Sequence, residues 1–327
     1  MQKRPLPVNI IFWGTSEFAL PSLAALTLQG YGIAAVITNP DEPAGRKAAL
    51  TAPPVKTWLK NQNQQIELLQ PERLDKNFRS QIADLEPQLF VVAAYGKILP
   101  KEILDIPKYG ALNIHPSLLP RWRGPSPIQY AILNGDLEAG VTIIKMDEEM
   151  DHGPILAQRE SGISKLQITN YKPTYKEQHD RLAKLGAKLL IETLPKWVRG
   201  EITPVPQDES KATYSKILTK DGGRIDWSKS AEEIERMIRA FNLWPGAWTA
   251  CSLRGQARRL RISEADILAD TPAGVPGMIW KNSAHPLLVK TGNGCLAVKT
   301  AGIEGRKLLP AADFIRGYPE LLGTVLE

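Results

Sequence analysis

The sequence predicts an α/β fold, with a doubly wound Rossmann-like parallel sheet followed by a small antiparallel β-barrel domain of OB-like type. In the first part of the chain, short apolar runs alternate with segments of helical spacing, which is typical of parallel strands joined by right-handed crossovers. In the last third, short strand-like runs follow one another between glycine and proline turns, as in a small barrel. With 327 residues the chain is about twice the usual domain size, so two domains are expected.

Five apolar runs are predicted to form the N-terminal sheet. The run over 89–94 is apolar at every position, as expected for a strand covered by helices on both faces. Gly14 follows the first run, but the G-x-G-x-x-G pattern is absent, so a dinucleotide site is not supported. In chain order the runs cover residues 8–13, 33–38, 89–94, 111–114 and 141–146.

A change of character near residue 195 predicts the domain boundary. Leucines recur at helical spacing up to residue 194, and proline and glycine then punctuate the chain. We expect a first domain over 1–194, a linker over 195–212 and a second domain over 213–327. In the second domain Ser230 and Glu233 have the spacing of a capping box at the start of a helix. Strands are expected afterwards over 247–253, 257–262, 277–280, 287–291 and 295–300.

The composition excludes several classes of protein. With 43% hydrophobic and 23% charged residues, the chain is not disordered, collagen-like or a coiled coil. No apolar stretch reaches the roughly 18 residues of a membrane span, and the start lacks a secretory signal, so we expect a cytoplasmic protein with no membrane contact. Cys251 and Cys295 form no C-x-x-C pair, which excludes a disulfide scaffold and a cysteine zinc site.

The positive charge is concentrated in the C-terminal third. Of 41 basic and 35 acidic residues, 17 basic and 12 acidic ones follow residue 209, so that part carries +5 of the net +6. Such asymmetry indicates a polyanion partner, although an ordinary protein surface can carry an excess of this size.

Asn113 and His115 are the first candidate site residues. They stand two positions apart at the end of a predicted strand, so their side chains share one face, and Pro116 ends the strand there. Ligands of open α/β sheets bind beyond the carboxyl ends of strands. An amide and an imidazole at that edge could donate hydrogen bonds to a carbonyl oxygen that becomes an oxyanion. The alternative is that both side chains only satisfy turn backbone groups.

Asp151 lies in the polar loop after the next predicted strand and should reach the same edge. A carboxylate beside an imidazole fixes its tautomer, raises its pKa and lets the pair relay a proton, so Asp151 is a candidate partner of His115. The alternative is a turn residue before Gly153. His152 and its acidic neighbours lack the spacing of a recognisable zinc or iron site, so no metal is expected.

The motifs along this edge resemble those of the folate-dependent formyltransferases. The resemblance rests on the segments over 94–100, 113–120 and 121–129, on Gly140-Val-Thr-Ile and on Asp151-x-Gly153. It implies that Asn113, His115 and Asp151 are the catalytic trio and that 10-formyltetrahydrofolate is the formyl donor, with no metal. It also implies folate contacts at Tyr95, Gly96, Ser117, Leu118, Leu119 and Pro120.

Within that family, the segment over 120–129 and the loop over 39–46 are most similar to the branch that formylates methionine esterified to initiator tRNA. Arg224-Ile-Asp-Trp227 and the segment over 239–245 agree with that branch. The resemblance implies a monomer that transfers the formyl group to the α-amino group of methionyl initiator tRNA. The second domain would hold the acceptor arm through its phosphates, a contact that is independent of sequence. The implied tRNA contacts are Arg46, Lys47, Arg259 and Arg261.

Two departures from the family pattern stand out. Lys47 is followed by Ala48, Ala49 and Leu50 where relatives usually carry basic residues, so fewer phosphate contacts are expected. Pro173 stands where a helix start often has Asp, which leaves the trio unaffected.

Two other functions stay open. Another user of 10-formyltetrahydrofolate, such as an amino-sugar formyltransferase or a hydrolase, would not explain the Arg46 loop. A tRNA-binding protein without catalysis would not explain the intact trio.

Overall fold

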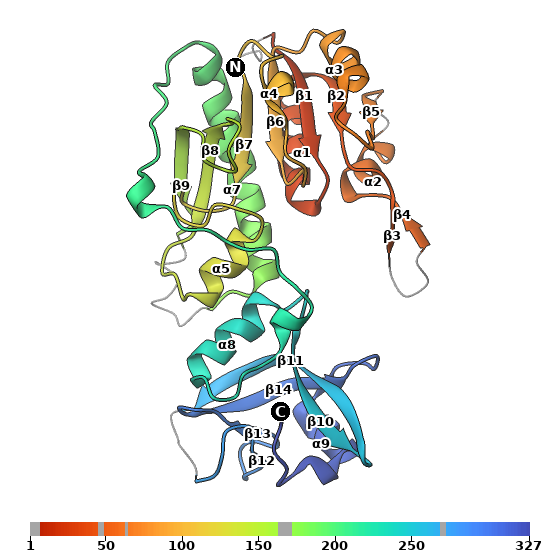
Figure 1. Ribbon diagram of the computed structural model, residues 1–327, viewed down its shortest axis with the longest axis vertical. Coiled ribbons are helices and arrows are strands. Elements are labelled where there is room, and N and C mark those ends of the chain that lie inside the picture. Colours follow the sequence, from red (N-terminus) through yellow and green to blue (C-terminus); the bar gives the residue numbers. More distant parts are fainter. Residues whose placement is uncertain (1–6, 45–48, 63–64, 163–171, 269–272) are drawn as a thin grey trace. The chain divides into compact units, whose positions relative to one another are not determined.

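The computed structural model describes residues 7–44, 49–62, 65–162, 172–268 and 273–327, which divide into two compact units (Figure 1). The first unit comprises Met1–Pro127, Leu137–Asn170 and His179–Lys216. The second comprises Ile128–Asp136, Tyr171–Gln178 and Ile217–Glu327. Two short segments that precede residue 179 therefore belong to the second unit, which no sequence pattern predicted.

The first unit is built on a seven-stranded sheet with the order β5-β2-β1-β6-β7-β8-β9. The strands from β5 to β7 pair in parallel, which confirms the expected α/β fold. The run over 141–146 departs from the parallel pairing expected of it, because β8 pairs antiparallel with both β7 and β9. An antiparallel neighbour needs no crossover. The strands are β1 (Asn9–Gly14), β2 (Gly32–Ile37), β5 (Glu67–Leu69), β6 (Leu89–Ala93), β7 (Ala111–His115), β8 (Gly140–Lys145) and β9 (Ile155–Glu160).

Helices cover this sheet, and a small hairpin projects from it (Figure 1). Glycine at position 186 lets α7 approach β7 closely, since a Cβ atom there would lie 2.7 Å from Ile114 Cγ2. Helix α7 continues past Pro195 to Val198, beyond the expected start of the linker. The helices of this unit are α1 (Leu20–Leu28), α2 (Pro54–Lys60), α3 (Lys76–Ala83), α4 (Lys101–Leu104) and, from His179 on, α7 (Tyr175–Val198), and the hairpin consists of β3 (Glu42–Ala44) and β4 (Ala49–Thr51). Apart from Pro127, α5 (Pro127–Leu133) belongs to the second unit.

The second unit contains an antiparallel sheet with the order β10-β11-β14-β13-β12, and β15 pairs with β14. Residues 324–327 close it into a barrel. On one side Ile279 N donates to Thr324 O, and on the other Ala250 N donates to Glu327 O. The expected barrel is thereby confirmed. The strands are β10 (Ala247–Leu253), β11 (Gln256–Leu268), β12 (Ile279–Trp280), β13 (Leu288–Lys290), β14 (Cys295–Ile303) and β15 (Leu309–Pro310).

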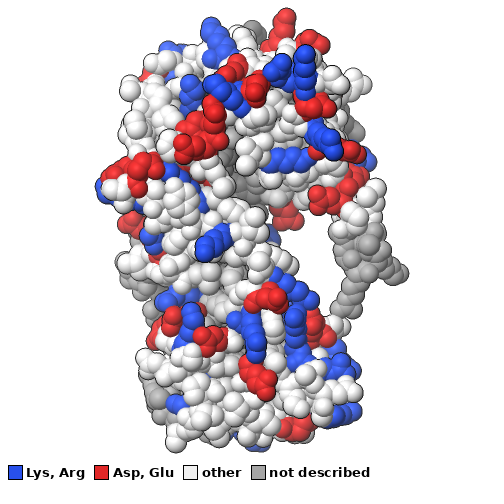
Figure 2. Space-filling view, viewed as in Figure 1, with Lys and Arg blue, Asp and Glu red and all other residues white. Residues whose placement is uncertain are grey.

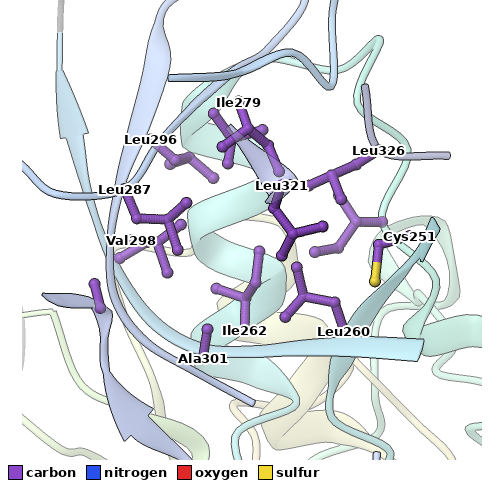
Figure 3. Close-up of a cluster of buried hydrophobic side chains, with 14 of the residues drawn as sticks. Cys251, Leu260, Ile262, Ile279, Leu287, Leu296, Val298, Ala301, Leu321 and Leu326 are labelled. Carbon is purple, nitrogen blue, oxygen red and sulfur yellow. The ribbon is translucent and has the colours of Figure 1, made fainter. Parts of the chain in front are cut away.

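Helix α8 (Ala231–Ala240) covers the core of this barrel. Its predicted capping box is confirmed, because Glu233 N donates to Ser230 Oγ and Ser230 N donates to the Glu233 carboxylate. Ile234 and Ile238 on its inner face join the apolar cluster that Figure 3 shows, together with residues of the strands and of α9 (Ala311–Gly317). Within the described ranges, no helix is long and apolar enough to cross a membrane.

Candidate active site

Strand β7 presents Asn113 and His115 on one face of the sheet. Ile114 packs toward Gly186 of α7, so its two neighbours point to the opposite face. The side chain of His115 is buried, with 4% of its surface exposed, and Asn113 is half-buried.

Asp151 reaches the same place from the loop after β8. Its backbone is left-handed, with φ of 53°. Gly153 allows the chain to turn back toward β9, because a Cβ atom there would lie only 1.9 Å from the carbonyl oxygen of Lys145. This loop geometry turns the Asp151 carboxylate toward β7.

The structure brings the three predicted catalytic residues together. Oδ1 of Asp151 accepts a hydrogen bond from Asn113 Nδ2 at 3.0 Å and lies 3.4 Å from His115 Nδ1. Oδ2 accepts from the backbone N–H of Gly124 at 2.8 Å. One carboxylate therefore binds an amide, an imidazole and a peptide N–H at once.

Both ring nitrogens of His115 have partners. Nε2 lies 2.9 Å from the carbonyl oxygen of Trp122, and because a carbonyl only accepts, Nε2 carries a hydrogen. Burial opposes the charged imidazole, but the Asp151 charge and the contacts with Asp151 and Trp122 outweigh it and raise the pKa of His115. Burial would likewise raise the pKa of Asp151, but the His115 charge and the Gly124 N–H lower it. The site thus favours a charged pair.

The loop of expected folate contacts, over 117–120, is firmly held by its neighbours. Leu119 N donates to Thr142 Oγ1 at 3.0 Å, and that hydroxyl donates to Ser117 O at 2.7 Å. Gln158 Nε2 donates to Leu119 O at 2.6 Å. The backbone groups of this loop are in use, while the side chains of Leu118 and Pro120 are half-exposed. Sequence reasoning missed Gln158, which lies on the unpredicted strand β9.

Tyr95 and Gly96 follow β6. The Tyr95 side chain is 2% exposed and meets the ring of Trp13 edge-on at 5.2 Å, so it packs in the core. Burial raises the pKa of Tyr95 to about 12. Its carbonyl oxygen accepts hydrogen bonds from Thr15 Oγ1 and Asn39 Nδ2, which ties together the ends of β1, β2 and β6. Gly96 has φ of 87°, a conformation that favours glycine.

The predicted tRNA contacts are only partly described. Arg46 and Lys47 lie outside the described residues, between β3 and β4. Arg259 and Arg261 lie on β11, opposite Ala250 and Trp248 of β10.

The guanidinium of Arg259 stacks 4.1 Å from the ring centre of Trp248 and lies 3.7 Å from Asp221. Lys and Arg side chains of the second unit alternate with Asp and Glu on the face that Figure 2 shows.

In the described part of the chain, no cluster of His, Cys, Asp and Glu could hold a metal ion.

Comparison with known proteins places this geometry in a family. The family "Formyl transferase" matches residues 8–194, and "Formyl transferase, C-terminal domain" matches 217–319. The methionyl-tRNA formyltransferase of Roseiflexus sp. (strain RS-1) is 46% identical over 314 residues, which cover 95% of this chain and 93% of the relative. That of Methylacidiphilum infernorum (isolate V4) is 42% identical over 323 residues, 98% of each chain.

Solved structures share the fold at low identity. WlaRD, a sugar 3N-formyl transferase, superposes with a TM-score of 0.62 at 18% identity, over 93% of this chain and 100% of that chain. HypX from Aquifex aeolicus, in complex with tetrahydrofolic acid, gives a TM-score of 0.62 at 17% identity and covers 97% of this chain, which spans only 48% of HypX. The matches to both domain families, together with the full-length relatives, show that the chain belongs to the formyl transferase family.

Proposed function

We propose that the protein transfers the formyl group of 10-formyltetrahydrofolate to the α-amino group of methionine esterified to initiator tRNA, as a monomer in the cytoplasm. Relatives that carry the name methionyl-tRNA formyltransferase match nearly the whole chain at 40–46% identity. The observation that carries the proposal is the convergence of Asn113, His115 and Asp151 at the end of β7.

The site can stabilise the charge that develops in acyl transfer. The neutral amine attacks the formyl carbon, and the carbonyl oxygen becomes an oxyanion. An amide nitrogen carries two hydrogens, so Asn113 Nδ2 can bind Asp151 with one and donate the other to the oxyanion. His115 contributes its positive charge. A direct bond from His115 Nε2 requires its contact with Trp122 O to open.

Asp151 keeps His115 charged and oriented, and its carboxylate is a base for the proton that the amine loses. When the tetrahedral intermediate collapses, the bond between the formyl carbon and the folate nitrogen breaks. That nitrogen takes up a proton, so the products are the formylated amine and tetrahydrofolate. Each step uses only groups held at the end of β7 and in the loops beside it.

We assign substrate binding to the remaining predicted residues. The donor would lie against Tyr95, Gly96 and the loop over 117–120, where the half-exposed Leu118 and Pro120 offer apolar surface. Residues 1–194 would form the catalytic domain. The basic part over 213–327 would bind tRNA phosphates through Arg259 and Arg261, and Arg46 and Lys47 would contact the end of the acceptor stem.

One assay tests the proposal against its alternatives. The protein is incubated with 10-formyltetrahydrofolate and one of three acceptors: methionyl initiator tRNA, an amino sugar nucleotide, or water alone. Release of tetrahydrofolate is followed, and the product is identified by mass. We expect formylmethionyl-tRNA to form at a rate far above that with the other acceptors. Equal or faster transfer to the sugar or to water would overturn the proposal.

A further inference from the structure

Arg123, a buried arginine, lies in the chain between the two residues whose backbone contacts His115 and Asp151. Trp122 offers the carbonyl oxygen that binds His115 Nε2, and Gly124 offers the N–H that binds Asp151 Oδ2. Arg123 links these two residues, and only 1% of its surface is exposed. Because its neighbouring peptide groups contact the histidine and the aspartate respectively, a shift of Arg123 would move both contacts together.

The guanidinium of Arg123 is anchored by the segment over 207–215. Its Nε and Nη2 donate to Gln207 Oε1 at 3.0 and 2.9 Å. Its Nη2 and Nη1 donate to the two carboxylate oxygens of Glu209 at 2.6 and 2.9 Å, and Nη1 also donates to Tyr214 Oη at 3.2 Å. A buried charge is tolerated when it is paired in this way, and a bidentate pair also fixes direction.

The backbone reinforces the anchor. Arg123 N donates to Thr213 O at 2.9 Å, and Ser215 N donates to Arg123 O at 2.7 Å. A Cβ atom on Gly124 would lie 2.6 Å from Ser215 O, so glycine is required where the two segments meet. The segment over 207–215 is therefore packed directly against the backbone that contacts the catalytic pair.

Gln207 connects this anchor to the other half of the site. Its Nε2 lies within hydrogen-bond distance of three successive carbonyl oxygens, at 2.8 Å from Asp151, 2.9 Å from His152 and 2.8 Å from Gly153. These carbonyls belong to the loop in which Asp151 is left-handed. One amide therefore fixes the Asp151 loop with its nitrogen and Arg123 with its oxygen.

We infer that Arg123 and Gln207 are positioning residues that set the distance between His115 and Asp151 from both sides of the pair. The inference rests on the proposed function for its effect on turnover. Neither side chain has to touch substrate. The segment that follows helix α7, which the sequence indicates only as a linker, thereby becomes part of the support of the active site.

Two variants that conserve charge test this inference. Arg123→Lys keeps the positive charge but cannot bind Gln207 and Glu209 in the same fork geometry. Gln207→Met keeps the approximate volume and stays neutral, but it removes the amide. Arg159→Lys is the matched control. Arg159 lies on strand β9 of the same unit and also donates two hydrogen bonds to one carboxylate, that of Glu192 on α7.

The measurements are kcat and KM for both substrates, the unfolding midpoint, and the pKa of His115. The chain has 4 histidines, so the imidazole signals can be followed by NMR and assigned with a His115→Gln variant. The charged groups that face His115 are Asp151 and, through Asp151, Arg123. Both test variants conserve charge, so a change in the pKa of His115 reports a change in geometry.

We expect kcat to fall about tenfold or more in Arg123→Lys and Gln207→Met, with KM within twofold of wild type, because small misplacements of catalytic groups are costly. The pKa of His115 should fall in both variants. Burial lowers this pKa, and a longer distance to Asp151 would weaken the charge interaction that raises it. Arg159→Lys should match wild type.

An unchanged pKa of His115, an unchanged kcat, or an equal loss in Arg159→Lys would overturn the inference. If the wild-type protein transfers no formyl group, the proposed function fails, and the pKa of His115 alone decides whether Arg123 and Gln207 position the pair.

Discussion

Asn113 Nδ2 donates to Asp151 Oδ1 at 3.0 Å, although the two residues are 38 positions apart in the chain. The same oxygen lies 3.4 Å from His115 Nδ1, so amide and imidazole share one acceptor. In the proposed reaction this sharing would give the two residues different roles. Asn113 would keep one hydrogen for an oxyanion, while His115, with partners at both nitrogens, would supply charge.

Asn113→Ala should lower kcat by about 10²-fold, the usual loss when an oxyanion donor is removed. His115→Ala should lower it by about as much, because the positive charge is lost. The rate is measured in single turnovers with saturating substrates. Asn134→Ala is the control, since that exposed amide donates to Tyr130 O on α5 and has no assigned role in the reaction. Near wild-type turnover in either variant would contradict its assignment.

Asp151→Asn keeps the shape of the side chain but removes the charge that raises the pKa of His115. In the wild type, His115 should stay charged above its ordinary pKa of about 6.5. In the variant, burial prevails and the pKa of His115 falls. We expect the alkaline limb of kcat against pH to move to lower pH, and turnover at neutral pH to collapse while folate binding persists. A variant with a normal profile would make Asp151 only a turn residue.

The His115–Asp151 pair should also make the stability of the protein depend on pH. The pKa of His115 is raised on folding, so its contribution is complete below about pH 6.5 and is lost as pH rises through the folded pKa. The pKa of Asp151 is lowered, so its contribution is complete above about pH 3.9 and is lost as pH falls through the folded pKa. The unfolding midpoint of wild type should therefore exceed that of Asp151→Asn most clearly between these limits. A constant difference at every pH would contradict the charged pair.

The sequence predicts the fold and the catalytic candidates because both depend on local pattern. Alternation along β7 places Asn113 and His115 on one face. Asp151 does contact them, but not from the expected edge, because β8 is antiparallel and its end, at Lys145, pairs with Leu112 near the start of β7. The antiparallel direction of β8 could not be predicted, because apolar runs carry no sign of strand direction. The contacts of Gln207 could not be predicted either, since a single glutamine that follows Pro204 and Pro206 is typical of a linker and its partners lie more than 50 residues away.

Gly153→Ala tests whether the turn of the Asp151 loop is needed. The added Cβ atom would lie 1.9 Å from Lys145 O, which is backbone and cannot rotate away. The loop must shift, so we expect a loss of about 1 to 3 kcal/mol in the free energy of unfolding and a lower kcat. Gly317→Ala on α9 is the control, because a Cβ atom there meets nothing within 4 Å. The two proteins are compared by denaturant unfolding and turnover. Equal stability and turnover would show that the loop adapts.

Arg259 and Arg261 should act on tRNA binding and not on chemistry. Replacing both by Ala should raise KM for tRNA with little change in kcat, and should reduce the slope of log affinity against log salt by about one to two units. Arg316→Ala, an exposed arginine on α9, is the control. Binding is measured over a series of salt concentrations. An unchanged slope would mean that neither arginine contacts a tRNA phosphate. Arg259 would then keep its contacts with Trp248, Asp221 and Glu304 in the complex, and Arg261 would be a solvated surface residue.

Arg46 is expected to carry the discrimination between initiator and elongator tRNA. It lies in the proline- and glycine-rich loop between β3 and β4, an insertion that no crossover between parallel strands requires. In relatives of this family, we expect the loop to enter the acceptor stem where initiator tRNA has a weak or absent first base pair. Opening a weak pair costs less free energy than opening a strong one, so discrimination arises from unpairing as well as from contact.

Arg46→Ala should therefore strongly lower kcat/KM for initiator methionyl-tRNA and narrow its advantage over elongator methionyl-tRNA, without altering the binding of the formyl donor. Because Ala48, Ala49 and Leu50 replace the usual basic residues, Arg46 should contribute more of the effect than in relatives. Lys76→Ala, an exposed lysine at the start of α3, controls for the loss of one positive charge. Both tRNAs are assayed with each protein. If wild type and Arg46→Ala show the same ratio of initiator to elongator kcat/KM, the loop does not determine specificity, and the preference must come from elsewhere in the acceptor-binding surface.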